Sequence, residues 1–301
     1  MIETILVPLD GSTLAEQALA VAGQLARRTK ARVVLVRVPN MEPAFATAES
    51  AYGLIYPEQA LGRASADARD YLKSVQALQK ARGLDVGTVT VDGDAAGGVV
   101  DVASQIKAGI IAMSSHGYSG LTRWLLGSVA EKVLRAATCP VLVVRSHRPI
   151  KRVLVPLDGS QLSQRALAPA LEVAQTLQAG VTLLRVVPEF HVEQLRGLDE
   201  FEYGLGPRLV EEQQADADSY LRRVSGPFVA QGLEVNCEVR IGPPASSILT
   251  YAENHAIDLI AMATHGRGGL QRWVYGSVTE KVLRAGDYSM LVVRPSADNL
   301  N

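Results

Sequence analysis

The feature that most constrains this chain of 301 residues is an internal repeat. The segment ILVPLDGS at 5–12 recurs as VLVPLDGS at 153–160, and the stretch 116–135 recurs at 265–284 with most positions unchanged. The first pair of segments is offset by 148 residues and the second by 149, so almost no length has changed across a whole unit. Such a period indicates duplication of a domain-sized unit. The polar stretch SHRP at 146–149 marks the boundary, which predicts domains at 1–147 and 148–301.

Each half alternates strand-like and helix-like segments. In the first half the patterns predict strands at 2–7, 32–38, 85–91, 110–113 and 141–144, and helices at 14–29, 60–82, 96–107 and 128–136. In the second half they predict strands at 152–155, 181–187, 234–240, 259–262 and 290–293. The strands are continuous apolar runs, which are typical of a sheet covered by helices on both faces. The predicted fold class is therefore α/β, with two tandem doubly wound domains that each contain a five-stranded, mostly parallel sheet.

Composition narrows the partners and the setting. The chain has 30 basic and 31 acidic residues and a formal net charge of −1, so neither nucleic acid nor an anionic membrane is an expected partner. The two cysteines, Cys139 and Cys237, lie far apart without metal-ligand spacing, which argues against a disulfide framework and a zinc site. Reduced cysteines fit the cytoplasm. The sequence shows no leader-like segment and no apolar run of bilayer length, so we expect a soluble cytoplasmic protein.

Two motifs follow predicted strands in both halves. PLDGS follows the first strand at 8–12 and 156–160, and a small-residue segment ending in His-Gly follows the fourth strand at 114–117 and 263–266. Doubly wound sheets bind ligands beyond the carboxyl ends of their strands, where the strand order reverses. If the first and fourth strands are neighbours, the two loops face one crevice.

The second loop continues to Gly127-Ser128 in the first half and to Gly276-Ser277 in the second, each directly before a predicted helix. The first amides of a helix are unpaired and lie at its positive end, where phosphate binds well. Glycine at this position lets the backbone approach a ligand closely. These helix starts are therefore candidate phosphate sites.

Structural interpretations stand beside the functional ones. The segments SVAE at 128–131 and SVTE at 277–280 also match capping boxes, in which the serine caps the helix. Asp10 and Asp158 could bind ribose hydroxyls or lie near a magnesium ion, or they could shape the turn between strand and helix. Both alternatives stay open at this point.

No catalytic residue emerges from the sequence. His116 and His265 have no carboxylate or cysteine at ligand spacing and suit a structural role better than that of a catalytic base. The chain lacks the P-loop motif, the Rossmann glycine motif after the first strand, the G-x-S-x-G elbow and H-E-x-x-H. P-loop, NAD-binding, serine hydrolase and zinc protease chemistry are therefore not expected.

These motifs resemble the universal stress protein family in its tandem-domain form, and the resemblance covers nearly the whole chain twice. Nucleotide-binding members of that family carry glycine, two residues, glycine, nine residues, then glycine and serine or threonine. Here nine residues separate Gly117 from Gly127-Ser128, and nine separate Gly266 from Gly276-Ser277. The first glycine of the pattern is replaced by a serine in one half and an alanine in the other. The alanine is the smaller intrusion, which favours the second site.

The resemblance implies an adenine nucleotide alpha hydrolase-like fold and an ATP site in one or both domains. In the first domain the implied contacts are Pro8, Asp10, Val38 and Met113 for adenine and ribose, and Ser114, Gly117, Gly127, Ser128 and Val129 for phosphate. In the second domain they are Pro156, Asp158, Val186, Met262, Ala263, Gly266, Gly276, Ser277 and Val278. A magnesium ion accompanying the nucleotide would lie near Asp10 or Asp158.

The resemblance also implies that two such domains pair through their fifth strands, here 141–144 and 290–293, within one chain, and a further homodimer is compatible with it. The leading functional hypothesis is a stress-response protein in which bound ATP changes conformation or assembly. The alternatives are a slow ATP hydrolase or phosphotransferase, and an interaction scaffold without nucleotide.

Overall fold

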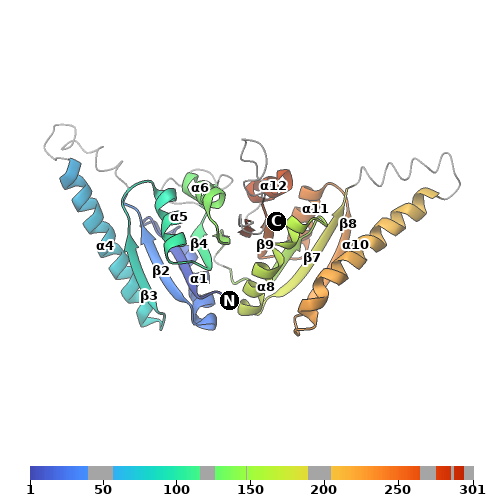
Figure 1. Cartoon of the computed structure of the whole chain (residues 1–301), viewed down its shortest axis with the longest axis horizontal. Helices are drawn as coiled ribbons and strands as arrows, with labels where there is room; N and C mark the ends of the chain where they lie inside the picture. Colours follow the sequence, from blue (N-terminus) through green and yellow to red (C-terminus); the bar gives the residue numbers. More distant parts are fainter. Residues whose placement is uncertain are drawn as a thin grey trace. The chain divides into compact units, whose positions relative to one another are not determined.

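The computed structural model describes residues 1–39, 57–115, 126–146, 148–188, 205–264, 276–285 and 288–294. The chain divides into two compact units, Met1–His147 and Arg148–Asn301 (Figure 1). Strands and helices alternate within each unit in the order expected from the sequence.

The first unit contains β1 (Thr4–Pro8), α1 (Gln17–Thr29), β2 (Arg32–Arg37), α4 (Pro57–Ala81), β3 (Val86–Thr90), α5 (Ala95–Gln105), β4 (Ile110–Ser114), α6 (Ser128–Ala136) and β5 (Val141–Val144). The second unit contains β6 (Arg152–Pro156), α7 (Gln161–Gln164), α8 (Leu167–Leu177), β7 (Gly180–Val187), α10 (Leu205–Val229), β8 (Val235–Ile241), α11 (Pro244–Asn254), β9 (Leu259–Ala263), α12 (Ser277–Ala285) and β10 (Ser289–Val293).

The strand order is β3-β2-β1-β4-β5 in the first unit and β8-β7-β6-β9-β10 in the second. Neighbouring strands are parallel, including β1 with β4, where Ile5 lies opposite Ile110, and β6 with β9, where Val153 lies opposite Leu259. The predicted tandem α/β fold is confirmed, and the first and fourth strands of each unit, whose adjacency the sequence left open, are neighbours. The order reverses between β1 and β4 and between β6 and β9, so the loops that follow these strands meet at one edge of each sheet.

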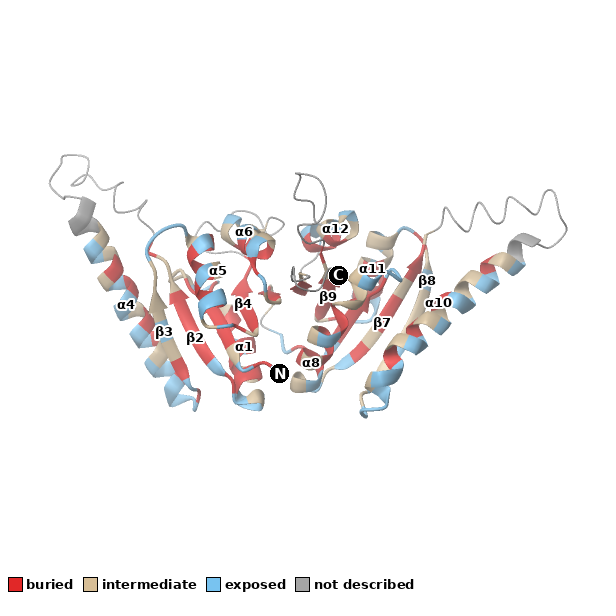
Figure 2. Ribbon diagram, viewed as in Figure 1, coloured by how far each residue is buried: buried red, intermediate tan, exposed pale blue. Residues whose placement is uncertain are grey.

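The sheet of each unit is covered on both faces. Right-handed crossovers place α1 and α4 on one face of the first sheet and α5 and α6 on the other, and α5 packs against α6. Every residue of β4 and β5 is buried (Figure 2). The helix α4 lies along the outer strand β3 in the first unit, and α10 lies along the outer strand β8 in the second (Figure 1). The continuous apolar strands of the sequence thus reflect burial from two sides.

Several predicted boundaries are wrong by two or three residues: the helices expected at 60–82 and 96–107 span Pro57–Ala81 and Ala95–Gln105, and the strand expected at 2–7 spans Thr4–Pro8. The helix expected to begin at residue 14 begins at Gln17, because residues 13–16 form turns. The Ser12 hydroxyl accepts a hydrogen bond from the Ala15 amide at 3.1 Å, and the Ser12 carbonyl accepts one from the Glu16 amide at 3.3 Å. The turn that begins at Asp10 therefore extends to the start of α1. In the described parts of the chain, no helix combines the length and apolar character needed to cross a membrane.

Candidate functional site

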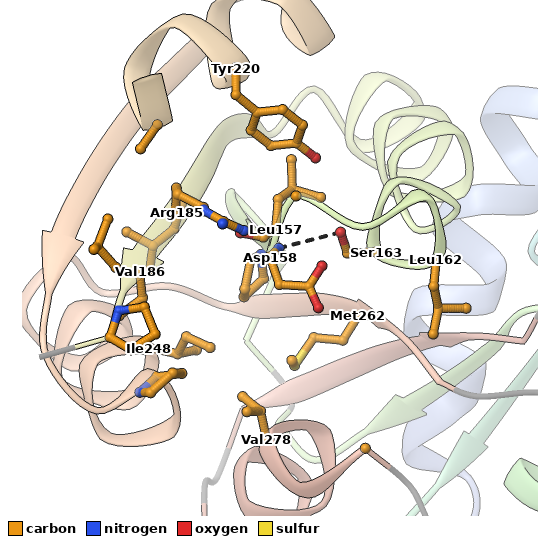
Figure 3. A pocket seen from close by; sticks show the side chains of 18 of the residues that line it. Leu157, Asp158, Leu162, Ser163, Arg185, Val186, Tyr220, Ile248, Met262 and Val278 are labelled. Atoms are coloured by element: carbon orange, nitrogen blue, oxygen red, sulfur yellow. Dashed lines mark hydrogen bonds between the residues drawn. The ribbon is translucent and has the colours of Figure 1, made fainter. Parts of the chain in front are cut away.

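A pocket of about 730 Å³ opens at the carboxyl ends of β6, β7 and β9 in the second unit (Figure 3). Its remaining walls come from α7, α10, α11 and α12. A volume of this size suits a small-molecule ligand. The pocket collects all of the described residues predicted for the second site: Pro156, Asp158, Val186, Met262, Ala263, Gly276, Ser277 and Val278. Gly266 and His265 lie outside the described residues.

Asp158 combines the two roles that the sequence left open. Its Oδ1 accepts hydrogen bonds from the Ser160 amide at 2.9 Å and the Ser160 hydroxyl at 2.6 Å, which closes the turn. The Ser160 hydroxyl in turn accepts from the Ser163 amide at 3.1 Å and caps α7. The carboxylate also lines the pocket and lies beside Met262 in Figure 3. It is therefore a turn-forming residue that is available to a ligand.

The charge state of Asp158 follows from these contacts. Burial raises the pKa of the carboxyl group, but hydrogen bonds from Ser160 and Ser163 and the positive charge of Arg185 outweigh that effect. The pKa of Asp158 therefore lies below its ordinary value, and the group is ionised at neutral pH. An ionised carboxylate at this position can accept hydrogen bonds from ligand hydroxyl groups.

Arg185 packs against the turn at residues 157–160 and donates a hydrogen bond to it. Gly159 has φ +85°, and a Cβ atom built there would lie 3.0 Å from Arg185 Nη1. The same Nη1 donates to the Leu157 carbonyl at 3.3 Å, and the guanidinium carbon lies 5.9 Å from the centre of the Tyr220 ring. Arg185 and Tyr220 both line the pocket, although sequence reasoning missed them. A signal was present, because they recur in the first half as Arg37 and Tyr71.

The helix starts differ from the capping-box interpretation, which is wrong. In the first unit the N-cap of α6 is Gly127, with φ −60° and ψ 147° and no side-chain cap. Its carbonyl accepts from the Glu131 amide at 2.9 Å, so Ser128 is already the first helical residue. The side chain of Glu131 forms an ion pair with Arg135.

The second unit repeats this arrangement. The Gly276 carbonyl accepts from the Glu280 amide at 3.0 Å, and α12 begins at Ser277. The amides of Ser277, Val278 and Thr279 therefore precede the first helical hydrogen bond and have no partner within the helix. All three residues line the pocket, so the positive end of α12 faces it.

The first unit brings its predicted residues to the corresponding edge. Pro8 ends β1, Met113 and Ser114 end β4, and Val129 lies in the first turn of α6. The Gly127 amide donates to the Ser115 carbonyl at 2.8 Å, which ties the start of α6 to the end of β4.

Asp10 and Val38 complete this edge. Asp10 Oδ1 accepts from the Ser12 amide at 2.9 Å and the Ser12 hydroxyl at 2.6 Å, as in the second unit. Val38 follows β2, and a Cβ atom built on Gly98 of α5 would lie 3.0 Å from its Cγ2. Gly117 and His116 lie outside the described residues. Among the residues that are described, no group of three or more His, Cys, Asp or Glu side chains could hold a metal ion.

The fold and the site define a class: a duplicated, doubly wound α/β protein with a ligand-sized pocket at the reversal of strand order. The model of the universal stress protein family matches residues 1–145 and again 149–294. The chain belongs to the universal stress protein family, in its tandem form.

Curated relatives and a solved structure agree with this assignment. Universal stress protein Rv2005c of Mycobacterium tuberculosis is 31% identical over 205 residues, which cover 63% of this chain and 63% of that protein. Universal stress protein YxiE of Bacillus subtilis is 33% identical over 150 residues, covering 48% of this chain and 100% of the relative. The crystal structure of a universal stress protein from Archaeoglobus fulgidus superposes with a TM-score of 0.74 at 23% identity, over 98% of this chain and 99% of that one. That likeness shows the shared fold.

Proposed function

We propose that the protein binds ATP in the pocket of the second unit and in the corresponding cleft of the first, and that the bound nucleotide changes conformation or assembly in a stress response. One observation carries the proposal. Apolar strand ends, an ionised carboxylate and the first turn of α12 converge on one pocket of about 730 Å³.

The apolar side of the pocket suits a purine base. Leu157, Val186, Ile248 and Met262 line it together, from β7, α11, β9 and the loop after β6 (Figure 3). Apolar walls with a few placed polar groups are typical of nucleotide-sized sites. The ionised carboxylate of Asp158 offers an acceptor for ribose hydroxyl groups.

The start of α12 suits phosphate. The first amides of α12 have no partner within the helix and lie at the positive end of its dipole, and Gly276 presents no side chain in front of them. The Ser277 hydroxyl adds a further donor at the same place. A magnesium ion bound with the phosphates would need few protein ligands. The carboxylate of Asp158, in the turn after β6, could supply one of them.

The pocket favours binding over turnover. Two carboxylates, Asp158 and Asp216, line the described pocket, and the lowered pKa of Asp158 makes it a weak general base. We therefore rank ATP hydrolysis or phosphate transfer below binding. A scaffold role without nucleotide would leave the ionised carboxylate and the open amides without a ligand.

Pairing of the two units is part of the proposal. In the strand order of each unit taken alone, β5 and β10 are terminal strands, and both are buried and, apart from Ser289, apolar. An apolar sheet edge is an aggregation hazard unless another strand covers it. We propose that these two strands cover each other within the chain and that a homodimer can form in addition. Sedimentation of the purified protein tests the dimer, and the expected cytoplasmic location stays a prediction.

The experiment is a nucleotide analysis of the full chain. Mass spectrometry of gently purified, denatured protein should release adenine nucleotide, and added ATP should raise the melting temperature. At one hundred times the dissociation constant, ligand binding stabilises by about 2.7 kcal/mol. Gly276→Val should abolish the effect at the second site. Gly62→Val is the control, because Gly62 lies on α4 with no neighbouring atom within 4 Å of a built Cβ. Nucleotide-free protein with no ATP response would refute the proposal.

A further inference from the structure

The pocket of the second unit and the site proposed at the matching strand ends of the first, called below the second and the first cleft, differ in charge at two corresponding positions. Glu16 in the first half corresponds to Gln164 in the second, and Asp94 corresponds to Pro243. Both differences replace a carboxylate by an uncharged residue, at positions next to the pocket-lining Ser163 and Pro244, while Asp10 and Arg37 keep their counterparts Asp158 and Arg185. The duplication therefore provides an internal comparison of two sites with one fold and unequal charge.

In the first unit Glu16 is part of a hydrogen-bonded group beside the turn. The Tyr71 hydroxyl donates to Glu16 Oε1 at 2.8 Å, and the guanidinium carbon of Arg37 lies 4.7 Å from the centre of the Tyr71 ring. The negative charge of Asp10 also raises the pKa of the Tyr71 phenol. The Tyr71 phenol therefore lies among Glu16, Asp10 and Arg37 at this end of the first cleft.

In the second unit the same group is incomplete. The Tyr220 hydroxyl is buried and has no hydrogen-bond partner in the described part of the chain. Gln164 is neutral, so the second unit lacks the carboxylate of Glu16, whereas Asp158 and Asp216 of the pocket have counterparts in Asp10 and Asp67. This end of the second cleft carries one negative charge fewer than the first.

The phosphate end shows a difference of the same sign. Asp94 caps α5 by accepting from the Gly97 amide at 2.9 Å, and its other oxygen pairs with Lys132 of α6 at 3.2 Å. In the second unit α11 begins after Pro243 with no side-chain cap, and Pro244 lines the pocket.

The second unit also has a lysine at this end, Lys281, without a carboxylate that corresponds to Asp94. Lys281 occupies the position of Lys132 in the first turns of α12, and it has no acidic partner among the described residues. The Asp94–Lys132 pair of the first unit neutralises itself, whereas the second unit keeps the lysine and lacks the aspartate.

We propose that Glu16 and Asp94 determine specificity: they make the first cleft select adenine nucleotides with few phosphates, whereas the second cleft binds the triphosphate tightly. The inference rests on the proposed nucleotide function and adds to it a division of labour between the two halves. Each carboxylate repels an anionic ligand, and the repulsion grows with the number of phosphates.

The test measures binding of ATP, AMP and adenosine to each cleft of the full chain by isothermal titration calorimetry. Gly276→Val silences the second cleft and Gly127→Val the first. We expect ATP to bind the second cleft more tightly than the first, with a smaller difference for AMP and the smallest for adenosine. Glu16→Gln and Asp94→Asn should each tighten ATP binding to the first cleft by roughly tenfold, the effect of a unit charge about 10 Å away at an effective dielectric constant of about 20. Asparagine preserves the helix cap.

Matched variants separate charge from structure. Gln164→Glu should weaken ATP at the second cleft, and Tyr71→Phe should leave the ATP-to-adenosine ratio unchanged because it keeps the Glu16 charge. Glu3→Gln removes an exposed carboxylate just before β1, at the opposite edge of the sheet, and should change ATP binding less than twofold. Equal ATP affinities at the two clefts, or a Glu16→Gln effect as large for adenosine as for ATP, would overturn the inference while leaving nucleotide binding intact. Absence of binding at both clefts would overturn the proposed function and the inference together.

Discussion

Replacement of Gly159 by alanine tests how the turn that carries Asp158 is held. Gly159 adopts φ +85°, and its built Cβ lies 3.0 Å from Arg185 Nη1, 3.2 Å from Nη2 and 3.3 Å from Cζ. Two effects should therefore add. The side chain is strained in the left-handed region, and the guanidinium must move away from the turn.

The magnitude follows from these two terms. A left-handed conformation costs a non-glycine residue about 1–2 kcal/mol. Displacement of Arg185 also sacrifices the hydrogen bond from Nη1 to the Leu157 carbonyl, which contributes about 0.5–1.5 kcal/mol. We expect Gly159→Ala to destabilise the second unit by roughly 1.5–3.5 kcal/mol.

Gly232→Ala is the matched control. Gly232 has φ +84°, but no atom lies within 4 Å of its built Cβ, so the control carries the backbone strain without the displacement of arginine. Native-state hydrogen exchange of amides in β6, β7 and β9 of the full chain gives the opening free energy of the second unit. The Gly159 variant should lose about 1 kcal/mol more than the control, and Arg185→Met should remove that excess in a double-mutant cycle.

Equal losses in the Gly159 and Gly232 variants would refute the reasoning. They would show that Arg185 adapts to the added methyl group without cost, and that it does not hold the turn in place. An excess that persists in the Arg185→Met background would refute the reasoning as well, because the strain would then come from another contact.

Three further predictions concern the same turns. Ser160→Ala removes the cap of α7 and should cost about 1 kcal/mol by hydrogen exchange, whereas equal protection in variant and wild type would contradict the cap. Burial and the Glu16 hydrogen bond raise the pKa of Tyr71, so the stability that its neutral phenol contributes is complete below pH about 10 and is lost as pH rises through the folded-state pKa. The difference in unfolding free energy between wild type and Tyr71→Phe should therefore shrink above about pH 10 in urea titrations. Tyr220→Phe removes a hydroxyl that has no partner in the described part of the chain, so it should cost little at any pH. The pKa of Asp158 is lowered, so the stability that its carboxylate contributes is present above the unfolded pKa of about 4 and disappears as pH falls through the folded-state pKa. In a plot of unfolding free energy against pH, Asp158→Asn should reduce the slope on the acid side. An unchanged slope would contradict the lowered pKa.

The fold could be predicted largely from the repeat and from apolar runs. Duplicated segments at offsets of 148 and 149 fix the number of units, and continuous strands such as 110–113 can be accommodated only in a sheet covered on both faces. The boundary at the start of α1 could not be predicted, because apolar spacing at residues 14 and 18 is equally compatible with a turn that precedes the helix. The hydrogen bond that the Ser12 hydroxyl accepts from the Ala15 amide decided that boundary.

The site was predictable where backbone geometry defines it. Loops after β6 and β9 must meet once these strands are neighbours, and all described residues of the predicted second site line one pocket. Arg185 and Tyr220 were missed because one belongs to a strand and the other to a long helix, and the way α10 returns over the strand ends is set by tertiary packing. The capping box failed for a local reason: a glycine occupies the N-cap, one position before the serine.

The most direct test of ATP binding at the strand-order reversal is a crystal structure of the full chain grown with ATP and magnesium. We predict density for the phosphates against the amides of Ser277 and Val278, with the ribose beside Asp158 and the base between Val186 and Met262. Pockets that remain free of nucleotide at saturating ATP, or phosphates bound away from the start of α12, would contradict the account.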